Sequence, residues 1–345
     1  MKKNIFAFIC AFTIPYIVLS MYIFLIDPYY VFHAPLFQME PIPQDAHYIA
    51  RGLIRNMDYD ILVCGSSMCE SMHTDYVDEV FHSKSIKVVQ HGSYSNDFAA
   101  SLKQAARSGK AQMVIMGLDS NVWQKPSEGY RIENIPQYAV TTPTIINAAS
   151  YLFNVDNLEP SLKLVVANSN GKPNPMNSWW LQPADYYSQK NVAAAWRELK
   201  EQGNGLRETD ETLAWENYSN LVEGIEECAD MGIPIKFFIP PYSVAYISLR
   251  DYGHDLDVCR EIWRELLQYD NVELYAVQFD TDLIQHLDWY RNTNHYNGEV
   301  SDMIIDDIAD KQYLLTIDNI DEEVDKFKKF LDGYDWKELE ASFVE

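Results

Sequence analysis

The sequence predicts an α/β protein with a five-stranded parallel sheet covered by helices on both faces. Short apolar runs alternate with helical patterns along most of the chain. The runs show little alternation of polar and apolar residues, which is typical of strands buried on both faces. Glycine, proline or polar residues follow most of the runs, at the edge of the sheet where ligands bind. Together these observations favour a layered α/β fold.

Two segments precede the predicted sheet. Residues 5–26 form a run of 22 residues without a charge, which reaches roughly 33 Å, the thickness of a bilayer core. No small-residue cleavage site ends the run, so we favour an uncleaved transmembrane anchor within residues 1–27 over a signal peptide. Lys2 and Lys3 predict a cytoplasmic N-terminus and an external remainder, a single-pass cell-membrane protein. Residues 28–44, rich in proline and aromatic side chains, are expected to form an extended linker.

The remainder, residues 45–345, is predicted to form one domain. Strands are expected near residues 60–64, 86–90, 112–116, 233–239 and 272–277, with helices between them. The proline-rich residues 121–206 interrupt this alternation and are expected to form an insertion of helices and loops. Residues 299–345 are expected to add C-terminal helices, whose acidic face is most simply solvated.

Composition argues against several partners and cofactors. The formal net charge is −24, which argues against nucleic acid and against a broad basic face on anionic lipid. The sequence contains neither C-x-x-C nor H-E-x-x-H, so we expect no metal and no cofactor. A Cys228–Cys259 disulfide and buried free thiols are both consistent with an oxidising exterior.

A serine and a histidine that follow distant strands form the candidate catalytic pair. Ser67 follows the first strand in Gly65-Ser66-Ser67, and His295 lies in a polar loop after the last strand. Carboxyl ends of parallel strands meet at one edge of a sheet, so the two side chains are expected to meet there. Acyl transfer needs such a hydroxyl and base, an orienting group and oxyanion donors. The structural alternative is a helix-capping Ser67, a His295 bonded to a strand end and an Asp119 that holds its turn.

The insertion also offers aromatic side chains to a substrate. Trp179 and Trp180 are suited to stacking on sugar rings. Core packing is the alternative for at least one of them.

These blocks resemble the SGNH (GDSL-like) hydrolase superfamily. They are most similar to its membrane-anchored branch, which contains DltD, the teichoic-acid D-alanylation protein, and the alginate-type polysaccharide O-acetyltransferases. The resemblance lies in Asp27-Pro28, Gly65-Ser66-Ser67-Met68, Gly117-Leu118-Asp119, Phe238-Ile239-Pro240-Pro241-Tyr242, His295-Tyr296-Asn297 and Leu314-Leu315-Thr316. It implies a flavodoxin-like α/β/α sandwich that acts on acyl esters of cell-surface glycopolymers, with a multispanning membrane acyltransferase as a partner.

The resemblance also implies residue roles. Ser67 takes the nucleophile position and His295 the base position, while the N–H groups of Ser67 and Gly92 take the oxyanion positions. Two positions differ from the family. Asn292 stands where an orienting Asp is usual, and Asp119 stands where the hydrolases carry an oxyanion-hole Asn, although the anchored branch shares Gly-Leu-Asp. Ser66, Asp119, Asn121 and Tyr242 are expected near the substrate.

Both departures weaken the catalytic expectation. In serine proteases the equivalent Asp-to-Asn change lowers turnover by about 10⁴ because the imidazole takes the wrong tautomer, whereas cysteine proteases use Asn as the orienter. Asp288 can replace Asn292 only if its loop folds back, and Asn121 can replace Asp119 as a donor.

The sequence therefore predicts an extracytoplasmic, membrane-anchored serine acyltransferase or esterase. Its substrates would be acetyl or D-alanyl esters of a cell-surface polysaccharide or teichoic-type polymer. The alternative is a catalytically weak or inactive subunit of the same fold that binds glycan or the membrane acyltransferase. A hydrolase of small free esters is a third hypothesis.

Overall fold

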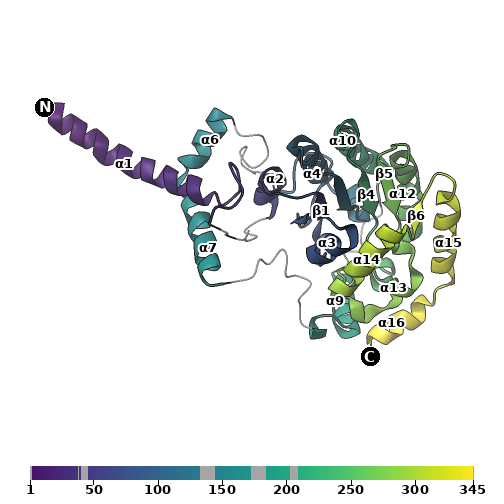
Figure 1. Cartoon of the computed structure of the whole chain (residues 1–345). Helices are drawn as coiled ribbons and strands as arrows, with labels where there is room; N and C mark the ends of the chain where they lie inside the picture. The colour runs from purple at the N-terminus through teal and green to yellow at the C-terminus, as the bar shows by residue number, and fades with distance from the viewer. Residues whose placement is uncertain are drawn as a thin grey trace.

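A six-stranded sheet forms the centre of the molecule (Figure 1). The computed structural model describes residues 2–37, 39, 46–132, 144–171, 184–202 and 209–344, with the backbone alone for residues 2–10, 12, 46 and 184. The strand order is β2-β1-β3-β4-β5-β6. The strands are β1 (Ile61–Gly65), β2 (Ser85–Val89), β3 (Met113–Gly117), β4 (Ile235–Phe238), β5 (Val272–Tyr275) and β6 (Leu314–Leu315).

The expected parallel strands are confirmed for β1 to β5, which pair in parallel register. The expectation of a five-stranded, wholly parallel sheet is wrong at one edge, where β6 pairs antiparallel with β5. This sixth strand has only two residues, Leu314 and Leu315, and so short a run carries no periodic signal. The order 2-1-3-4-5 of the parallel strands is one of the two common orders of doubly wound sheets.

Helices cover both faces of the sheet (Figure 1). On one face α3 packs against α14, and on the other α4 packs against both α2 and α10. The outer helix α15 packs on α12, and α16 packs on α9. Their bounds are α2 (Ala46–Asn56), α3 (Thr74–Phe81), α4 (Ser95–Ser108), α9 (Gln189–Glu201), α10 (Glu211–Asp230), α12 (Tyr252–Leu266), α14 (Gly298–Asp310), α15 (Ile320–Gly333) and α16 (Trp336–Val344).

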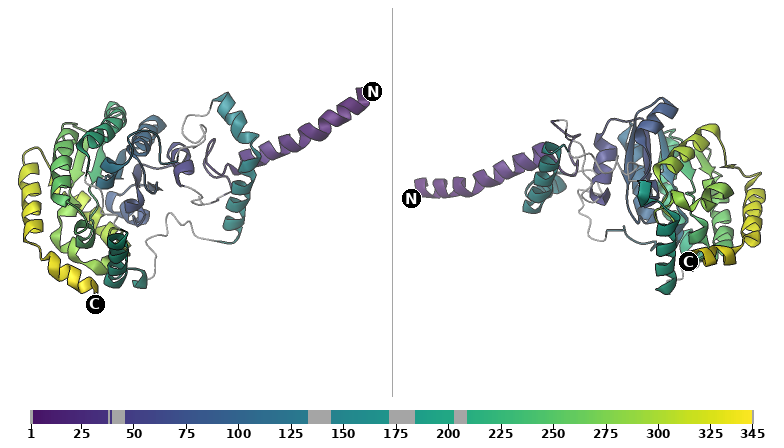
Figure 2. Two further views of the ribbon diagram at one scale, coloured as in Figure 1. Left: turned by 180° about the vertical axis from the view of Figure 1, so that it is seen from behind. Right: turned by 90° about the horizontal axis from the view of Figure 1, so that it is seen from below.

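The expected insertion lies between β3 and α10. Its described elements are η2 (Ser120–Gln124), α6 (Ile145–Leu152), η3 (Val155–Asn157), α7 (Leu158–Ser169), η5 (Ala184–Tyr186) and α9. Helices α6 and α7 do not pack on the sheet but against the end of α1 (Lys2–Ile26) that adjoins the domain (Figures 1 and 2). The insertion therefore contacts two separate parts of the molecule: α6 and α7 pack against α1, and α9 packs against the C-terminal helix α16.

Helix α1 projects away from the domain and carries the N-terminus at its far end (Figure 2). Within the described part of the chain, no helix combines the length and the hydropathy needed to cross a membrane. The anchor expected at residues 5–26 therefore stays a prediction.

The start of the expected linker is not extended but turns around a buried carboxylate. Asp27 accepts hydrogen bonds from the backbone N–H groups of Val31 (2.9 Å), Phe32 (2.7 Å) and His33 (3.1 Å) and from the Tyr151 hydroxyl (2.9 Å). Three N–H groups converging on one carboxylate hold a turn that the proline and aromatic composition does not reveal. The turn joins α1 firmly to α6.

The cysteines outside α1 are all buried free thiols. Cys64, Cys69, Cys228 and Cys259 form no disulfide. Of the two alternatives left open by the sequence, the structure has the reduced one for Cys228 and Cys259. Burial raises the pKa of the Cys69 and Cys228 thiols to about 12, so neither is expected to react as a thiolate.

Candidate active site

The turn after β1 brings the Ser67 hydroxyl to the carboxyl edge of the sheet. A Cβ atom on Gly65 would lie 2.6 Å from the Cys69 sulfur and 3.1 Å from the Gly117 carbonyl oxygen, so only glycine fits here. The chain can therefore turn directly into the 3₁₀ helix η1 (Ser67–Cys69). Ser66 caps this helix, because its hydroxyl oxygen accepts a hydrogen bond from the Met68 N–H (3.2 Å).

His295 reaches Ser67 from the loop between η7 (Leu287–Trp289) and α14. Its Nε2 lies 2.8 Å from the Ser67 Oγ. Two buried hydrogen bonds lock this loop onto the serine turn: the Tyr296 hydroxyl donates to the Met68 carbonyl, and the Ser71 hydroxyl donates to the Tyr296 carbonyl (2.9 Å). The structure thus brings together the two residues that the sequence placed at one edge of the sheet.

Asn292 orients the imidazole through its side-chain oxygen. Its Oδ1 accepts from the backbone N–H groups of Asn294 (3.2 Å) and His295 (2.9 Å) and lies 3.1 Å from the His295 Nδ1. A backbone N–H can only donate, so the atom facing the ring must be the amide oxygen. The proton of the imidazole then resides on Nδ1, which leaves Nε2 as the acceptor for the Ser67 O–H. The Asp-to-Asn difference therefore leaves the tautomer correct.

Charged neighbours and burial keep the imidazole neutral. Burial lowers the pKa of His295 to about 3, and the positive charges of Arg291 and His91 act in the same direction. Arg291 is paired with the buried carboxylate of Glu70, and the His91 Nε2 lies 3.6 Å from that carboxylate. Burial raises the pKa of Glu70 to about 7, although Arg291 and Lys87 oppose the shift.

We expect modification of Ser67 to remain fast in mild acid. A base must be neutral to accept a proton, so its rate follows the neutral fraction of His295. At pH 5 only about 3% of an ordinary imidazole of pKa 6.5 is neutral, whereas an imidazole of pKa about 3 is almost wholly neutral. Protonation of Glu70 below pH 7 removes the negative charge that offsets Arg291. The positive charge of Arg291 then opposes protonation of His295 more strongly. The rate of fluorophosphonate labelling at pH 5 should be within about twofold of the rate at pH 7.5. A fall of tenfold or more, with the protein still folded by circular dichroism, contradicts this expectation.

Two backbone N–H groups at the site make no hydrogen bond within the described part of the chain. They belong to Ser67 and Gly92, the pair expected to bind an oxyanion. Gly92 has φ +68°, a left-handed conformation that favours glycine. The preceding carbonyl, of His91, accepts from the His47 Nε2 at 3.0 Å. In a trans peptide the C=O and N–H point in opposite directions, so His47 fixes the direction of the Gly92 N–H.

His47 is itself held from behind by polar side chains. Its Nδ1 lies 3.5 Å from the Asp97 carboxylate and 3.4 Å from the Gln90 amide nitrogen.

We expect His47→Phe, which keeps a ring but loses the donor, to slow serine labelling by roughly tenfold, less than the 10² to 10³ lost when an oxyanion donor is deleted. His47→Gln restores a donor and should recover most of the rate. Equal loss in both variants at unchanged unfolding midpoints would exclude this positioning role.

Several residues expected near the substrate are instead buried supports. Ser66 donates a short hydrogen bond to Asp119, and both are at most 5% exposed. Tyr242 is fully buried and stacks on Tyr246 at 4.5 Å, with its hydroxyl accepting from the Asn121 amide (3.2 Å). Burial raises the pKa of Asp119, and the Ser66 hydroxyl opposes that shift. Asp119 thus supports the turn that carries Ser67. Asn121 is hydrogen-bonded to the hydroxyl groups of Tyr242 and Tyr246.

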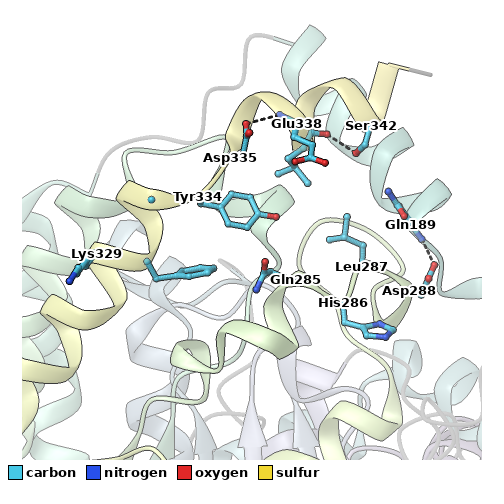
Figure 3. A pocket seen from close by; sticks show the side chains of 13 residues that line it. Gln189, Gln285, His286, Leu287, Asp288, Lys329, Tyr334, Asp335, Glu338 and Ser342 are labelled. Atoms are coloured by element: carbon cyan, nitrogen blue, oxygen red, sulfur yellow. Dashed lines mark hydrogen bonds between the residues drawn. The ribbon is translucent and has the colours of Figure 1, made fainter.

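Asp288 does not replace Asn292. Its carboxylate accepts from the Gln189 backbone N–H at 2.8 Å, on the wall of a separate pocket of about 860 Å³ (Figure 3). This pocket lies between α9, α13 (Thr281–Gln285), α15 and α16, and its lining includes neither Ser67 nor His295. Trp179 and Trp180 lie outside the described residues.

Sequence reasoning missed four functional neighbours: His47, Glu70, His91 and Arg291. Two of them carried a usable signal, because Glu70 follows Ser67 by three positions and Arg291 immediately precedes Asn292. His47 carried none, since its role depends on how α2 packs beside β2.

No protein-family model matches the chain, and no curated protein matches it. The fold and the site alone therefore define the class of this protein. It is an α/β protein with a mostly parallel sheet, and a serine, a histidine and an asparagine are linked by hydrogen bonds at the carboxyl edge of that sheet.

Proposed function

We propose that the chain is a membrane-anchored serine acyltransferase or esterase of the SGNH type that faces the cell exterior. The observation that carries this proposal is the 2.8 Å contact between the His295 Nε2 and the Ser67 Oγ, with Asn292 fixing the tautomer. The strand order supports the flavodoxin-like sandwich that the sequence resemblance implies.

The chemistry proceeds by two displacements at one acyl carbon. His295 takes the Ser67 proton as Oγ bonds to the acyl carbon, and the N–H groups of Ser67 and Gly92 receive the oxyanion. The ester C–O bond then breaks, and the leaving alcohol takes the proton from Nε2. A sugar hydroxyl or water attacks acyl-Ser67, gives its proton to His295, and the proton returns to Ser67.

The proposed substrate is an acetyl or D-alanyl ester of a cell-surface polysaccharide or teichoic-type polymer. A multispanning membrane acyltransferase is the proposed donor partner. Both proposals rest on the resemblance of the Gly65-Ser66-Ser67 and His295 blocks. The anchor is proposed at residues 5–26, with the N-terminus cytoplasmic, because this uncharged run follows Lys2 and Lys3.

A serine-directed fluorophosphonate probe tests the proposal on the full-length chain in nanodiscs. Labelling that maps to Ser67 by peptide mass spectrometry supports a nucleophilic serine. Release of acetate or D-alanine from an acylated polymer then distinguishes the substrate classes. Absence of labelling in the folded protein favours a noncatalytic subunit of the same fold that binds glycan.

A further inference from the structure

The exposed apolar side chains of this protein are concentrated in one region. Within the described residues, 21 large apolar side chains are exposed, and 15 of them belong to residues 14–37 or 145–166. These two segments form α1 with its adjoining turn and the pair α6–α7. The much larger α/β domain contributes only the remaining six. Concentration of this kind marks an interaction surface.

Helices α6 and α7 expose apolar residues along their outer faces. Ile145 and Ile146 of α6 are 91% and 77% exposed, and Phe153, which directly follows the last residue of the helix, is 52% exposed. On α7, Leu162 and Val166 lie one turn apart and are 48% and 56% exposed. These are the side chains that a helix in contact with water would normally turn inward.

The opposite faces of the two helices are already occupied. Tyr151 of α6 is fully buried in a small cluster with Ile23 of α1 and Val31 of the adjoining turn, and its hydroxyl donates to Asp27. Pro160, Ser161 and Leu164 of α7 are likewise buried. Both helices lie crosswise over the end of α1, one on each side of it (Figures 1 and 2). The two helices thus adjoin α1, whose own exposed large side chains are also apolar.

The low charge of α6 and α7 favours a lipid bilayer over a protein as the partner of their apolar faces. Residues 145–169 contain three side chains that are charged at neutral pH, Asp156, Glu159 and Lys163, and the last two form an ion pair at 2.7 Å. The segment therefore has neither the basic face that binds anionic headgroups nor the charges that would fix the orientation of a protein partner. Its attraction is apolar burial, which a neutral lipid surface satisfies.

We propose that α6 and α7 are interfacial helices that lie in the plane of the bilayer, at its boundary with water, on either side of the point where α1 leaves it. The inference rests on the anchor of the proposed function for its orientation. A helix pair of this kind inserts its apolar side chains into the headgroup and upper acyl region. The buried Asp27 turn then makes α1, α6 and α7 one rigid support. The support holds the active-site domain at a constant distance from the membrane.

Site-directed fluorescence quenching tests this placement in the full-length protein. Single cysteines replace Ile146, Val166, Ile17 and Ile317 in a Cys10→Ser background, where the other native cysteines are buried. Each is labelled with an environment-sensitive nitrobenzoxadiazole dye in nanodiscs of neutral phosphatidylcholine. Ile17 reports the anchor, and Ile317 is the matched control, an exposed apolar residue in the loop before α15.

Nitroxide attached to the lipid chains is expected to quench the dye at positions 146 and 166 roughly threefold more than at 317, with blue-shifted emission. Adding anionic lipid should leave this ratio unchanged. Quenching at 17 but not at 146 and 166, with those two dyes quenched by aqueous iodide, overturns the interfacial placement and leaves the anchor intact. Absence of lipid quenching at 17 instead overturns the proposed anchor.

Discussion

Replacing Ser67 by alanine is expected to abolish fluorophosphonate labelling and to lower acyl transfer by about 10⁶-fold, as in serine enzymes whose nucleophile acts together with its base. Without the Oγ there is no atom to bond to the acyl carbon, and His295 loses the hydroxyl 2.8 Å from its Nε2. The fold should be retained, because no structural hydrogen bond of the described residues depends on this hydroxyl.

Labelling with a fluorophosphonate dye, read on gels and by mass spectrometry, measures the effect directly. Ser219→Ala provides the matched control, since Ser219 is an exposed hydroxyl on α10 that donates only to its own helix. The control variant should be labelled at the wild-type rate. Labelling of Ser67→Ala at the wild-type stoichiometry would show that another side chain reacts, and Ser67 would then not be the nucleophile.

Replacing Asn292 by alanine is expected to slow labelling by about 10³-fold, somewhat less than the loss reported for removing an orienting carboxylate. Three donors converge on its oxygen, the N–H groups of Asn294 and His295 and the Nδ1–H of the imidazole. Alanine leaves the imidazole free to rotate and to adopt the other tautomer, in which Nε2 carries the proton and cannot accept one.

The Asn292→Asp variant separates the orientation of the His295 ring from the effect of a negative charge beside it. A carboxylate accepts the same three donors, so the ring should stay in place, and its negative charge raises the pKa of His295. Because the tautomer is already correct, we expect a gain of only roughly tenfold and not the 10⁴ seen where an Asp-to-Asn change also reverses the tautomer. The rates of both variants should be compared with their pH profiles. If alanine and aspartate lower the rate equally, Asn292 has no orienting role.

Local patterns were sufficient wherever a structure depends on neighbours in sequence. The strands at 61–65 and 113–117 were predictable because five consecutive residues are apolar or glycine and both faces of the strand are buried. The insertion was predictable because its prolines interrupt the alternation of strands and helices, and its described elements are helical. The two-residue strand β6 was not, since it exists only by pairing with β5.

The candidate site shows the same division. Ser67 and His295 were identified because a parallel sheet gathers the carboxyl ends of its strands. The burial of Asp119 beneath Ser66 was not predictable, because the sequence gives no sign of what covers a carboxylate that follows a strand. The turn around Asp27 was also missed, since one of its four donors comes from Tyr151, more than a hundred positions away.

The sequence by itself determined the five parallel strands with the helices between them, the uncharged N-terminal run and the candidate pair Ser67 and His295, because each follows from composition, short-range periodicity or position after a strand. Only the tertiary structure decided which atom of Asn292 faces the imidazole, that His47 holds the peptide before Gly92, and that α6 and α7 flank the end of α1. These contacts join residues that are adjacent only after the backbone has folded, and their hydrogen-bond directions depend on donors that no local pattern encodes.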